Sequence, residues 1–169
     1  MDSILTDRYA LVTGASRGIG KLIAIALAEQ GCKLLLHSRN LEHTRPIAQQ
    51  LISNGCEVEC FAADLSLPDG ARRLVEDIQH YGLQVDILYN NAAQMPEYSE
   101  DPCLIPARVY RDIMETNLVA PVVLSNALLP AMLERGWGRV INLTSAIDKL
   151  PQLAPYAVSK AALKKYTLD

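Results

Sequence analysis

The sequence predicts an α/β fold in which helices cover both faces of a parallel β-sheet. Short runs with the composition of strands alternate along the chain with longer segments of helical pattern, as in repeated β-α-β units. One of these runs, residues 33–38, is almost continuously apolar, which is typical of a strand buried on both faces of a parallel sheet. With 169 residues, half of them apolar, the chain is long enough to form one domain with its own core.

The expected elements follow a regular order. Strands are predicted at residues 9–13, 33–38, 57–63, 85–89 and 139–144. Helices are predicted at residues 19–30, 44–53, 68–81 and 108–135, and Pro155 is expected to open a last helix. Gly31 is expected to end the first helix, as glycine commonly does.

Charge and composition narrow the classes of partner. The net charge is −3 and the Lys and Arg residues are scattered, so nucleic-acid binding has little support. The apolar stretch at residues 118–133 is short for a bilayer span and is interrupted by prolines, and nothing before the first strand resembles a signal peptide. The four cysteines, Cys32, Cys56, Cys60 and Cys103, form no pattern of metal ligands. We therefore expect a cytoplasmic protein with reduced thiols, no bound metal and no membrane association.

A glycine-rich loop lies between the first strand and the first helix. The run from Thr13 to Gly20 contains Gly14, Gly18 and Gly20, and glycines there allow a tight turn and a close approach of the backbone to a pyrophosphate. A glycine loop alone is weak evidence, but between a strand and a helix it predicts a Rossmann-type, doubly wound sheet. Such sheets have the strand order 3-2-1-4-5-6. Five strands therefore predict the order 3-2-1-4-5, in a three-layer αβα domain that lacks its last strand.

The end of the second strand indicates which dinucleotide is preferred. An acidic residue at this position would hold the ribose 2′-hydroxyl of NAD, but the sequence has no carboxylate between His37 and Asn40. Arg39, together with Arg17 in the glycine loop, could pair with the 2′-phosphate of NADP instead. The alternative is that both are ordinary solvated arginines. We favour NADP(H) over NAD(H).

Polar residues also follow the remaining strands, and a tyrosine and a lysine lie in the last helix. Asp64, Asn91 and the pair Thr144-Ser145 each come directly after or at the end of a predicted strand, and ligands of open α/β sheets bind at these ends. Tyr156 and Lys160 are four residues apart, so a helix places an ammonium beside a phenol, and this neighbour favours the phenolate. Each residue alone has an ordinary structural explanation, as a turn former or a surface residue. Together they indicate one site.

These motifs in this order resemble the short-chain dehydrogenase/reductase family in its classical branch. The resemblance is carried by the glycine loop, Asp64-Leu65, the run from Asn90 to Ala93, Asn117, Ser145 and Tyr156-x-x-x-Lys160, and it extends over residues 9–163. It implies an NADP(H)-dependent oxidoreductase that transfers a hydride between nicotinamide and a carbonyl or secondary alcohol. Helix 108–135 would be the surface that forms a homodimer or homotetramer.

The resemblance also implies roles for single residues. Tyr156 would be the general acid or base, Lys160 would assist it and bind the nicotinamide ribose, Ser145 would hold the substrate oxygen, and Asn117 would hold a water of a proton relay. Thr144 is a weaker candidate than Ser145 for the hydroxyl. The cofactor would be bound by Gly14, Ser16, Arg17, Gly18, Ile19, Gly20, Ser38, Arg39, Asp64, Leu65, Asn91, Ala92, Tyr156 and Lys160.

Two departures from the family pattern keep alternatives open. Ala93 stands where the family has glycine, and the chain ends shortly after Lys160, where the family continues into a further strand and a substrate-covering loop. Residues 1–169 are therefore expected to be a single dinucleotide-binding domain, cut within or just after the catalytic helix. A truncated, non-catalytic nucleotide-binding or dimerisation protein is the second interpretation. A methyltransferase ranks last, because it would give Ser145, Tyr156 and Lys160 no role.

Overall fold

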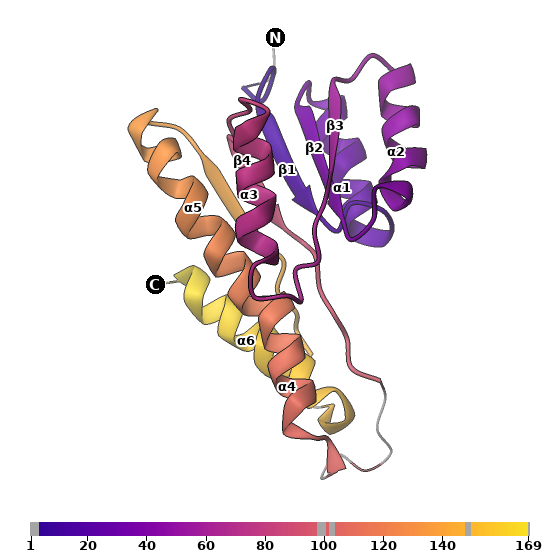
Figure 1. Cartoon of the computed structure of the whole chain (residues 1–169), viewed down its shortest axis with the longest axis vertical. Helices are drawn as coiled ribbons and strands as arrows, with labels where there is room; N and C mark the ends of the chain where they lie inside the picture. Colours follow the sequence, from indigo (N-terminus) through magenta and orange to yellow (C-terminus); the bar gives the residue numbers. More distant parts are fainter. Residues whose placement is uncertain (1–3, 98–100, 102–103, 148–149, 169) are drawn as a thin grey trace.

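A computed structural model describes residues 4–97, 101, 104–147 and 150–168. Its centre is a five-stranded sheet in the order β3-β2-β1-β4-β5, with every pair of neighbours parallel (Figure 1). This confirms the predicted order 3-2-1-4-5. The strands are β1 Tyr9–Thr13, β2 Lys33–Ser38, β3 Val58–Ala62, β4 Ile87–Asn90 and β5 Arg139–Asn142.

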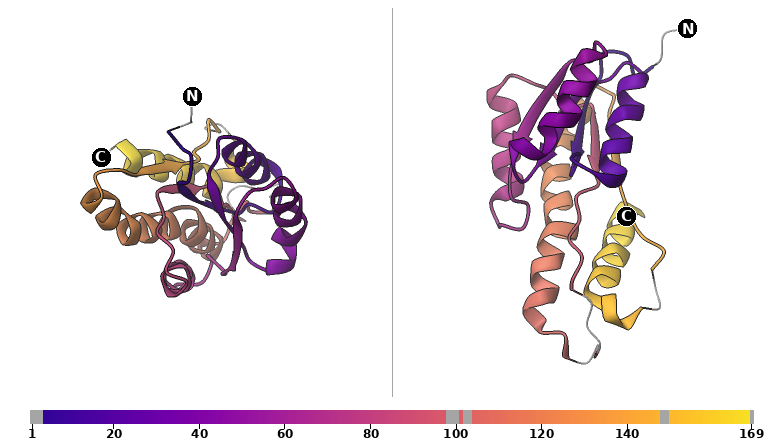
Figure 2. Two further views of the ribbon diagram at one scale, coloured as in Figure 1. Left: turned by 90° about the horizontal axis from the view of Figure 1, so that it is seen from above. Right: turned by 90° about the vertical axis from the view of Figure 1, so that its right-hand side faces the viewer.

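Helices cover both faces of this sheet and extend beyond its carboxyl end, where α4 and α6 lie (Figures 1 and 2). The α-helices are α1 Gly18–Glu29, α2 Leu41–Ser53, α3 Gly70–His80, α4 Ala107–Met114, α5 Ala120–Glu134 and α6 Ala154–Leu168. A π-helical turn, Glu115–Val119, joins α4 to α5, and a 3-10 turn, Pro151–Leu153, precedes α6.

The core consists of two clusters separated by the sheet. Side chains alternate across a strand, so Leu34 and Leu36 of β2 pack with Ile47 and Leu51 of α2 on one face. Leu35 points to the other face and belongs to the cluster formed by α3 and α5. The β2 side chains that face either cluster are fully buried. This explains why the sequence of β2 is almost continuously apolar.

Several boundaries differ from the prediction for local reasons. Helix α2 begins at Leu41 instead of residue 44, because Asn40 caps it by accepting a hydrogen bond from the Glu42 N–H at 3.0 Å. Strand β4 is Ile87–Asn90, shifted from 85–89, and β5 ends at Asn142 instead of residue 144. The pair Thr144-Ser145 therefore lies in the loop beyond β5.

The predicted helix 108–135 exists as one rod, Ala107–Glu134, but it contains the π-helical turn that the sequence pattern did not predict. Pro121 has no N–H, so the regular hydrogen bond to the carbonyl of Asn117 cannot form. The turn closes instead with the Ala120 N–H donating to the carbonyl of Glu115. This local widening places Asn117 inside the protein, where its exposed fraction is 0%.

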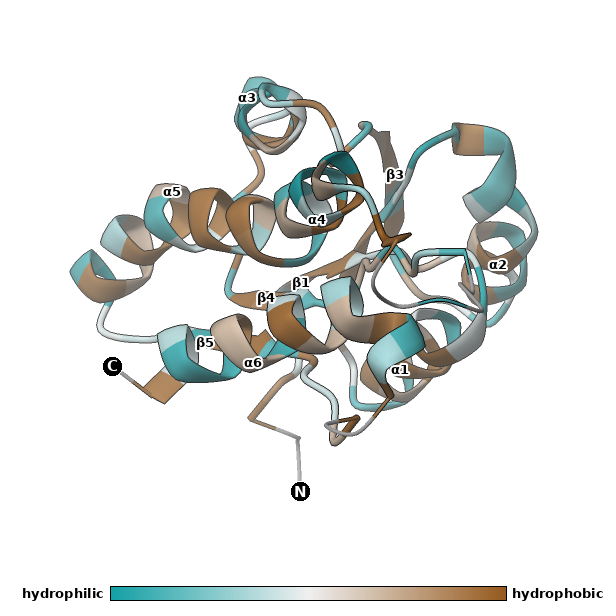
Figure 3. Ribbon diagram, turned by 90° about the horizontal axis from the view of Figure 1, so that it is seen from below, coloured by the Kyte–Doolittle hydropathy of each residue, from teal (hydrophilic) through white to brown (hydrophobic). Residues whose placement is uncertain are grey.

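The same rod corrects the expectation that its apolar stretch is too short for a bilayer span. With 28 residues and a mean hydropathy of 1.5 in its most apolar window, Ala107–Glu134 is long and apolar enough to cross a membrane by length and composition. Leu124, Leu128 and Met132 belong to the same buried cluster as Leu74 of α3, as in the core helix of a globular domain. In the ribbon coloured by hydropathy, apolar and hydrophilic segments both occur along α5 (Figure 3).

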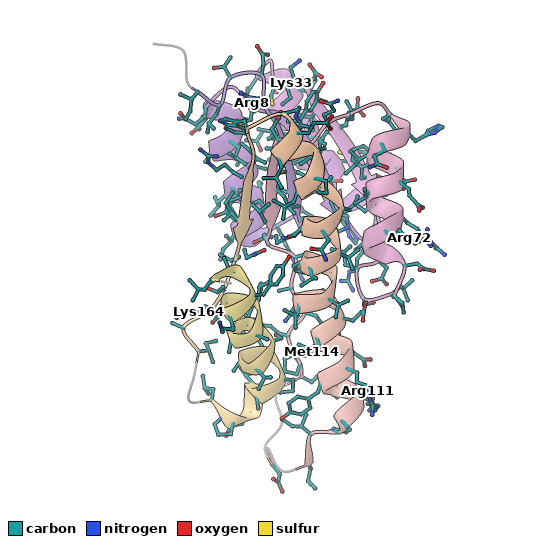
Figure 4. The ribbon with its side chains drawn as sticks, turned by 90° about the vertical axis from the view of Figure 1, so that its left-hand side faces the viewer. Arg8, Lys33, Arg72, Arg111, Met114 and Lys164 are labelled. Atoms are coloured by element: carbon teal, nitrogen blue, oxygen red, sulfur yellow. The ribbon has the colours of Figure 1, made fainter. Side chains whose placement is uncertain are left out.

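Ion pairs concentrate at the amino end of the sheet. Arg8 and Lys33 lie together at that end, far from α4 and α6, whereas Arg72 points outward from α3 (Figure 4). Arg8 and Arg135 both approach the carboxylate of Asp86, at 3.5 and 3.4 Å, and the Tyr9 N–H donates to the same carboxylate at 3.1 Å. These contacts connect the residues next to β1, β4 and the end of α5. They lie at the end of the sheet opposite the carboxyl ends of the strands.

Candidate functional site

A cavity of about 880 Å³ lies at the carboxyl ends of the strands. Its walls come from the segments that follow β1, β2, β3, β4 and β5, so the sequence-predicted residues meet at one place. Those that line the cavity are Gly14, Ser16, Arg17, Gly18, Ile19, Gly20, Ser38, Arg39, Asp64, Leu65, Asn91, Ala92 and Tyr156. Asn117, Ser145 and Lys160 are not part of its wall.

The glycine loop follows β1 and is fixed by Asn91. Gly14 has a φ of 66°, a conformation that side chains disfavour. A Cβ on Gly20 would overlap the carbonyl oxygen of Gly14 and the amide nitrogen of Asn91. Asn91 Nδ2 donates to the carbonyl oxygens of Thr13 at 2.9 Å and of Gly14 at 3.2 Å. This close packing leaves a cradle of backbone that fits a pyrophosphate.

The arginines expected to bind a 2′-phosphate lie in the cavity wall, and the charge of Arg39 acts on the nearby Asp64 carboxyl, whose pKa it helps to lower. Arg17 and Arg39 are exposed and line the cavity, and neither forms an ion pair with any described residue. The described part of the cavity wall holds a single carboxylate, Asp64. The Asp64 carboxylate accepts hydrogen bonds from the Ser66 hydroxyl at 2.7 Å and the Ser66 N–H at 3.0 Å, and these bonds lower its pKa. Asp64 is therefore an acceptor held at the edge of the cavity.

Tyr156 and Lys160 lie one turn apart on α6, as predicted. Tyr156 lines the cavity, and the Lys160 ammonium is 5.9 Å from the centroid of its ring. Lys160 is 2% exposed, and its ammonium donates to the carbonyl oxygen of Leu143 at 2.7 Å. Burial lowers the pKa of Lys160 to about 8. A buried ammonium therefore lies next to the ring of Tyr156.

Asn117 acts as a bridge between the π-helical turn, the loop after β4 and α6. Its Oδ1 accepts from the Gln94 N–H at 2.7 Å, and its Nδ2 donates to the Gln94 carbonyl at 3.0 Å. The same Nδ2 group donates to the Ser159 hydroxyl at 3.0 Å, and Ser159 donates in turn to the carbonyl of Tyr156 at 2.7 Å. Asn117 is thus connected to the backbone of Tyr156 through Ser159, a residue the sequence analysis did not single out.

A second polar chain holds α6 on the sheet. Asn90 Nδ2 donates to Asn142 Oδ1 at 2.8 Å, and Asn142 Nδ2 donates to the Thr167 hydroxyl at 3.0 Å. β4, β5 and the last turn of α6 are therefore linked by side chains. The arrangement keeps Tyr156 and Lys160 in a fixed position relative to the strand ends.

Ser145 lies in the loop between β5 and α6. Its hydroxyl accepts a hydrogen bond from the Ile147 N–H at 3.2 Å, which forms a local turn. Thr144 and Ser145 are both half-buried, and neither contributes to the wall of the cavity. The described structure thus places Ser145 near the cavity's end but not in it.

Ala93 takes the place of a glycine without backbone strain. Among the described residues other than glycine, only Asp7 has a positive φ. Ala93 therefore adopts an ordinary conformation, and it lines the cavity beside Ala92.

His37 also lines the cavity, and the sequence analysis assigned it no role. It is the residue before Ser38 at the end of β2, so the strand-end pattern that selected Ser38 and Arg39 could have found it. Its ring contacts the glycine loop and the end of β3.

Three of the cysteines lie outside the cavity wall. Cys32, Cys56 and Cys60 are free thiols in or against the core cluster that contains Ile47 and Leu51 of α2, and burial raises the pKa of each. Cys103 lies outside the described residues. Within the described ranges, no three His, Cys, Asp or Glu side chains are grouped in a way that could hold a metal ion.

Comparisons with known proteins agree with this geometry. The sequence profile of the short chain dehydrogenase family matches residues 8–169. Among curated proteins, a short chain dehydrogenase, penD, of Penicillium thymicola is 35% identical over 96% of this chain and 62% of its own length. The 3-oxoacyl-(acyl-carrier-protein) reductase FabG of Pseudomonas aeruginosa is 33% identical over 96% of this chain and 66% of its own length. The chain thus spans less than two thirds of these relatives.

Solved structures show the same fold. A metagenomic short-chain oxidoreductase, crystallised in complex with NADP, superposes with a TM-score of 0.89 at 30% sequence identity. The match covers 97% of this chain and 75% of the other.

Proposed function

The chain belongs to the short chain dehydrogenase family, and from this premise we propose that it is an oxidoreductase using NADP(H) on a carbonyl or secondary alcohol. The observation that carries the proposal is the position of Tyr156 on the wall of a strand-end cavity with the Lys160 ammonium behind its ring. When bound, the nicotinamide supplies or takes the hydride.

The glycine loop and the two arginines would hold the dinucleotide. The cradle around Gly14 and Gly20 excludes side chains, which fits a pyrophosphate. Arg17 and Arg39 form no ion pair with any described residue, so both guanidinium groups are available to pair with the 2′-phosphate. This favours NADP(H) over NAD(H). Asp64, Leu65 and Asn91 would border the adenosine and the middle of the groove. The NADP complex of the metagenomic relative is consistent with this choice.

The proton chemistry would belong to α6. The Tyr156 hydroxyl would give its proton to the substrate oxygen during reduction and take it back during oxidation. Lys160 places a positive charge beside the phenol, which stabilises the phenolate that remains, and would bind the nicotinamide ribose. Ser145 would hold the substrate oxygen, and Asn117 would support a water of the proton relay.

We also propose that this protein works in the cytoplasm and self-associates as a homodimer or homotetramer through the rod Ala107–Glu134. Val119 and Leu133 of that rod are exposed apolar side chains, and a second copy would cover them. Sedimentation of Leu133→Asp beside the wild type would test the assembly. A wild type that sediments as a monomer would contradict it.

The function is tested by binding and turnover together. NADPH and NADH are titrated into the chain, and turnover is measured against a panel of ketones, keto acids, sugars and acyl thioesters. Tyr156→Phe should lose turnover by at least about 1,000-fold while the NADPH affinity stays within about threefold. Tyr166→Phe is the matched control, because Tyr166 lies on the same helix outside the cavity wall and should change neither quantity.

The outcomes separate the two interpretations of the sequence. Turnover that survives in Tyr156→Phe would overturn the assignment of the proton donor. NADPH binding with no turnover on any substrate would favour the non-catalytic nucleotide-binding protein.

A further inference from the structure

His37 is a buried histidine inside the candidate cofactor site. It lies at the end of β2, is 2% exposed, and belongs to the wall of the strand-end cavity. The proposed proton chemistry and the proposed phosphate contacts do not use it. Its ring lies between Gly14, which follows β1, and Ala63, which follows β3.

The hydrogen bonds of the His37 ring define its protonation state. Nδ1 accepts from the Gly14 N–H at 3.4 Å, and Nε2 faces the carbonyl oxygen of Ala63 at 3.0 Å. An N–H can only donate and a carbonyl oxygen can only accept, so the proton must be on Nε2 and Nδ1 must be bare. The geometry is satisfied only by the neutral imidazole with this tautomer.

Gly14 is therefore held from both sides of its backbone. His37 accepts from its N–H, and the side chain of Asn91 donates to its carbonyl oxygen at 3.2 Å. The residue has a positive φ of 66°, and the turn that it makes packs directly against Gly20. Its conformation determines the shape of the cradle.

We propose that His37 is a positioning residue for the dinucleotide: its neutral ring clamps the Gly14 peptide in the turn that receives the pyrophosphate and anchors this turn to the end of β3 at Ala63. The proposal rests on the proposed function, since a dinucleotide is the ligand of this cradle. In this proposal His37, on β2, holds the glycine loop that follows the neighbouring strand β1.

The surroundings keep the ring neutral. Burial lowers the pKa of His37 to about 4, against the opposing effects of its bond to Ala63 and of the Asp64 carboxylate. The other ionisable side chains of the cavity wall are Arg17 from the glycine loop, Arg39 after β2, His43 of α2 and Tyr156 of α6. The neutral ring, and with it the hydrogen bond to Gly14, is therefore present at pH values well above this pKa of about 4.

Three variants of His37 test the clamp. His37→Leu removes both hydrogen bonds, His37→Gln retains a polar end at the Nε2 position, and His37→Asn retains one at the Nδ1 position. Leu35→Val is the control, since it is a buried change on the same strand at a residue outside the cavity wall. Two quantities are measured: the dissociation constants of NADP+ and NADPH by calorimetry, and the exchange rate of the Gly14 amide hydrogen by NMR without ligand.

The expected effects on Gly14 and on binding follow from the loss of the hydrogen bond between the Gly14 N–H and the His37 ring. His37→Leu should weaken dinucleotide binding about five- to tenfold and speed Gly14 exchange by a similar factor. His37→Asn should stay within about twofold of the wild type in both, and His37→Gln should behave like His37→Leu. Equal affinity and equal Gly14 exchange in His37→Leu and wild type would overturn the proposal. A loss of affinity in Leu35→Val as large as in His37→Leu would overturn it too, since the effect would then be general destabilisation.

The two measurements separate this proposal from the proposed function. A wild-type chain that binds neither dinucleotide would contradict the proposed function, and the role of His37 in binding would fall with it. The clamp on Gly14 would then be decided by the exchange rates alone, supported by faster exchange in His37→Leu and contradicted by unchanged exchange.

Discussion

The ammonium of Lys160 donates to the carbonyl oxygen of Leu143 at 2.7 Å, which joins α6 to the first residue after β5. Leu143 in turn donates its N–H to the carbonyl of Asn90, the last residue of β4. The lysine is therefore fixed by the same strand ends that form the cavity. A surface lysine would be free to move, whereas this one is held where a charge beside the phenol is needed.

Lys160→Met should change how stability depends on pH. The folded pKa of Lys160 is about 8 and the unfolded value is about 10.5, so between these pH values the unfolded chain binds more protons than the folded one. The free energy of unfolding of the wild type should therefore rise relative to Lys160→Met as pH increases from 8 to 10.5, by roughly 2–3 kcal/mol. Urea titrations across this range measure it. Lys164→Met, an exposed change on the same helix, should show no such trend, and a flat difference for Lys160→Met would contradict the burial of the charge.

Ser159→Ala should uncouple α6 from the π-helical turn. Ser159 is fully buried and connects the side chain of Asn117 to the carbonyl of Tyr156, so its removal leaves the Asn117 amide with one donor unsatisfied. We expect a loss of about 1–3 kcal/mol in stability and faster exchange of the Gln94 amide. Ser125→Ala is the matched control, because Ser125 is equally buried but bonds only to the carbonyl of Pro121 in its own helix. Equal effects of the two variants on Gln94 exchange would refute the link.

Arg39→Ala should lower the affinity for NADPH and leave the affinity for NADH unchanged. A hydrogen bond between charged groups contributes about 1.5–3 kcal/mol, so the loss for NADPH should be about 10- to 100-fold. Arg45→Ala, which breaks an exposed pair with Glu42 on α2, should change neither affinity. A parallel decrease for both cofactors would show that Arg39 does not read the 2′-phosphate.

Gly20→Ala and Gly18→Ala should differ although they lie two residues apart. A methyl on Gly20 would overlap the backbone of Gly14 and the amide of Asn91, whereas one on Gly18 meets no atom within 4 Å. Gly18→Ala should cost about 1–2 kcal/mol, from its positive φ alone. Gly20→Ala should displace the Gly14 turn and reduce NADPH affinity by more than about tenfold. The two variants are compared by calorimetric titration and thermal unfolding, and equal affinities would contradict the close packing.

His37→Asn should remove an acid-dependent loss of stability. His37 has a folded pKa of about 4 and an unfolded value near 6.5, so the unfolded chain binds more protons between these values and the wild type becomes less stable as pH falls through them. The difference should amount to about 3 kcal/mol between pH 6.5 and 4. Guanidinium titrations of both proteins over this range provide the measurement. Parallel curves would mean that the buried histidine is not neutral.

The sequence allowed the sheet order and most of the cavity wall to be predicted, because both follow from local signals. Alternating strands and helices determine a parallel sheet, and glycines or polar residues after each strand identify its carboxyl end. His37 lies beside the strand-end residues Ser38 and Arg39, but its position in the sequence does not show which groups its ring contacts. Its role appears only when Gly14 and Ala63, distant in sequence, are brought to its ring.

The π-helical turn was missed for a related reason. The periodicity of residues 108–135 predicts a helix correctly, but it cannot show where one hydrogen bond is absent. Pro121 was the available clue, since a proline in a helix has no N–H to donate to the carbonyl four residues before it. The pairing of Asn117 with Gln94 and Ser159 depends on this turn and was equally hidden.

The turn at Glu115–Val119 has a consequence for mutation by deletion. One residue more than a regular turn is accommodated there, and each residue of an α-helix corresponds to a rotation of about 100°. Because the turn already absorbs one extra residue, removing a single residue from it would leave α4 facing α6 and α5 facing α3 much as they do now. A one-residue deletion within α4 or α5 would instead rotate one part of the rod against the other by that angle. A single deletion should therefore be tolerated better at these five positions than in the regular helix on either side.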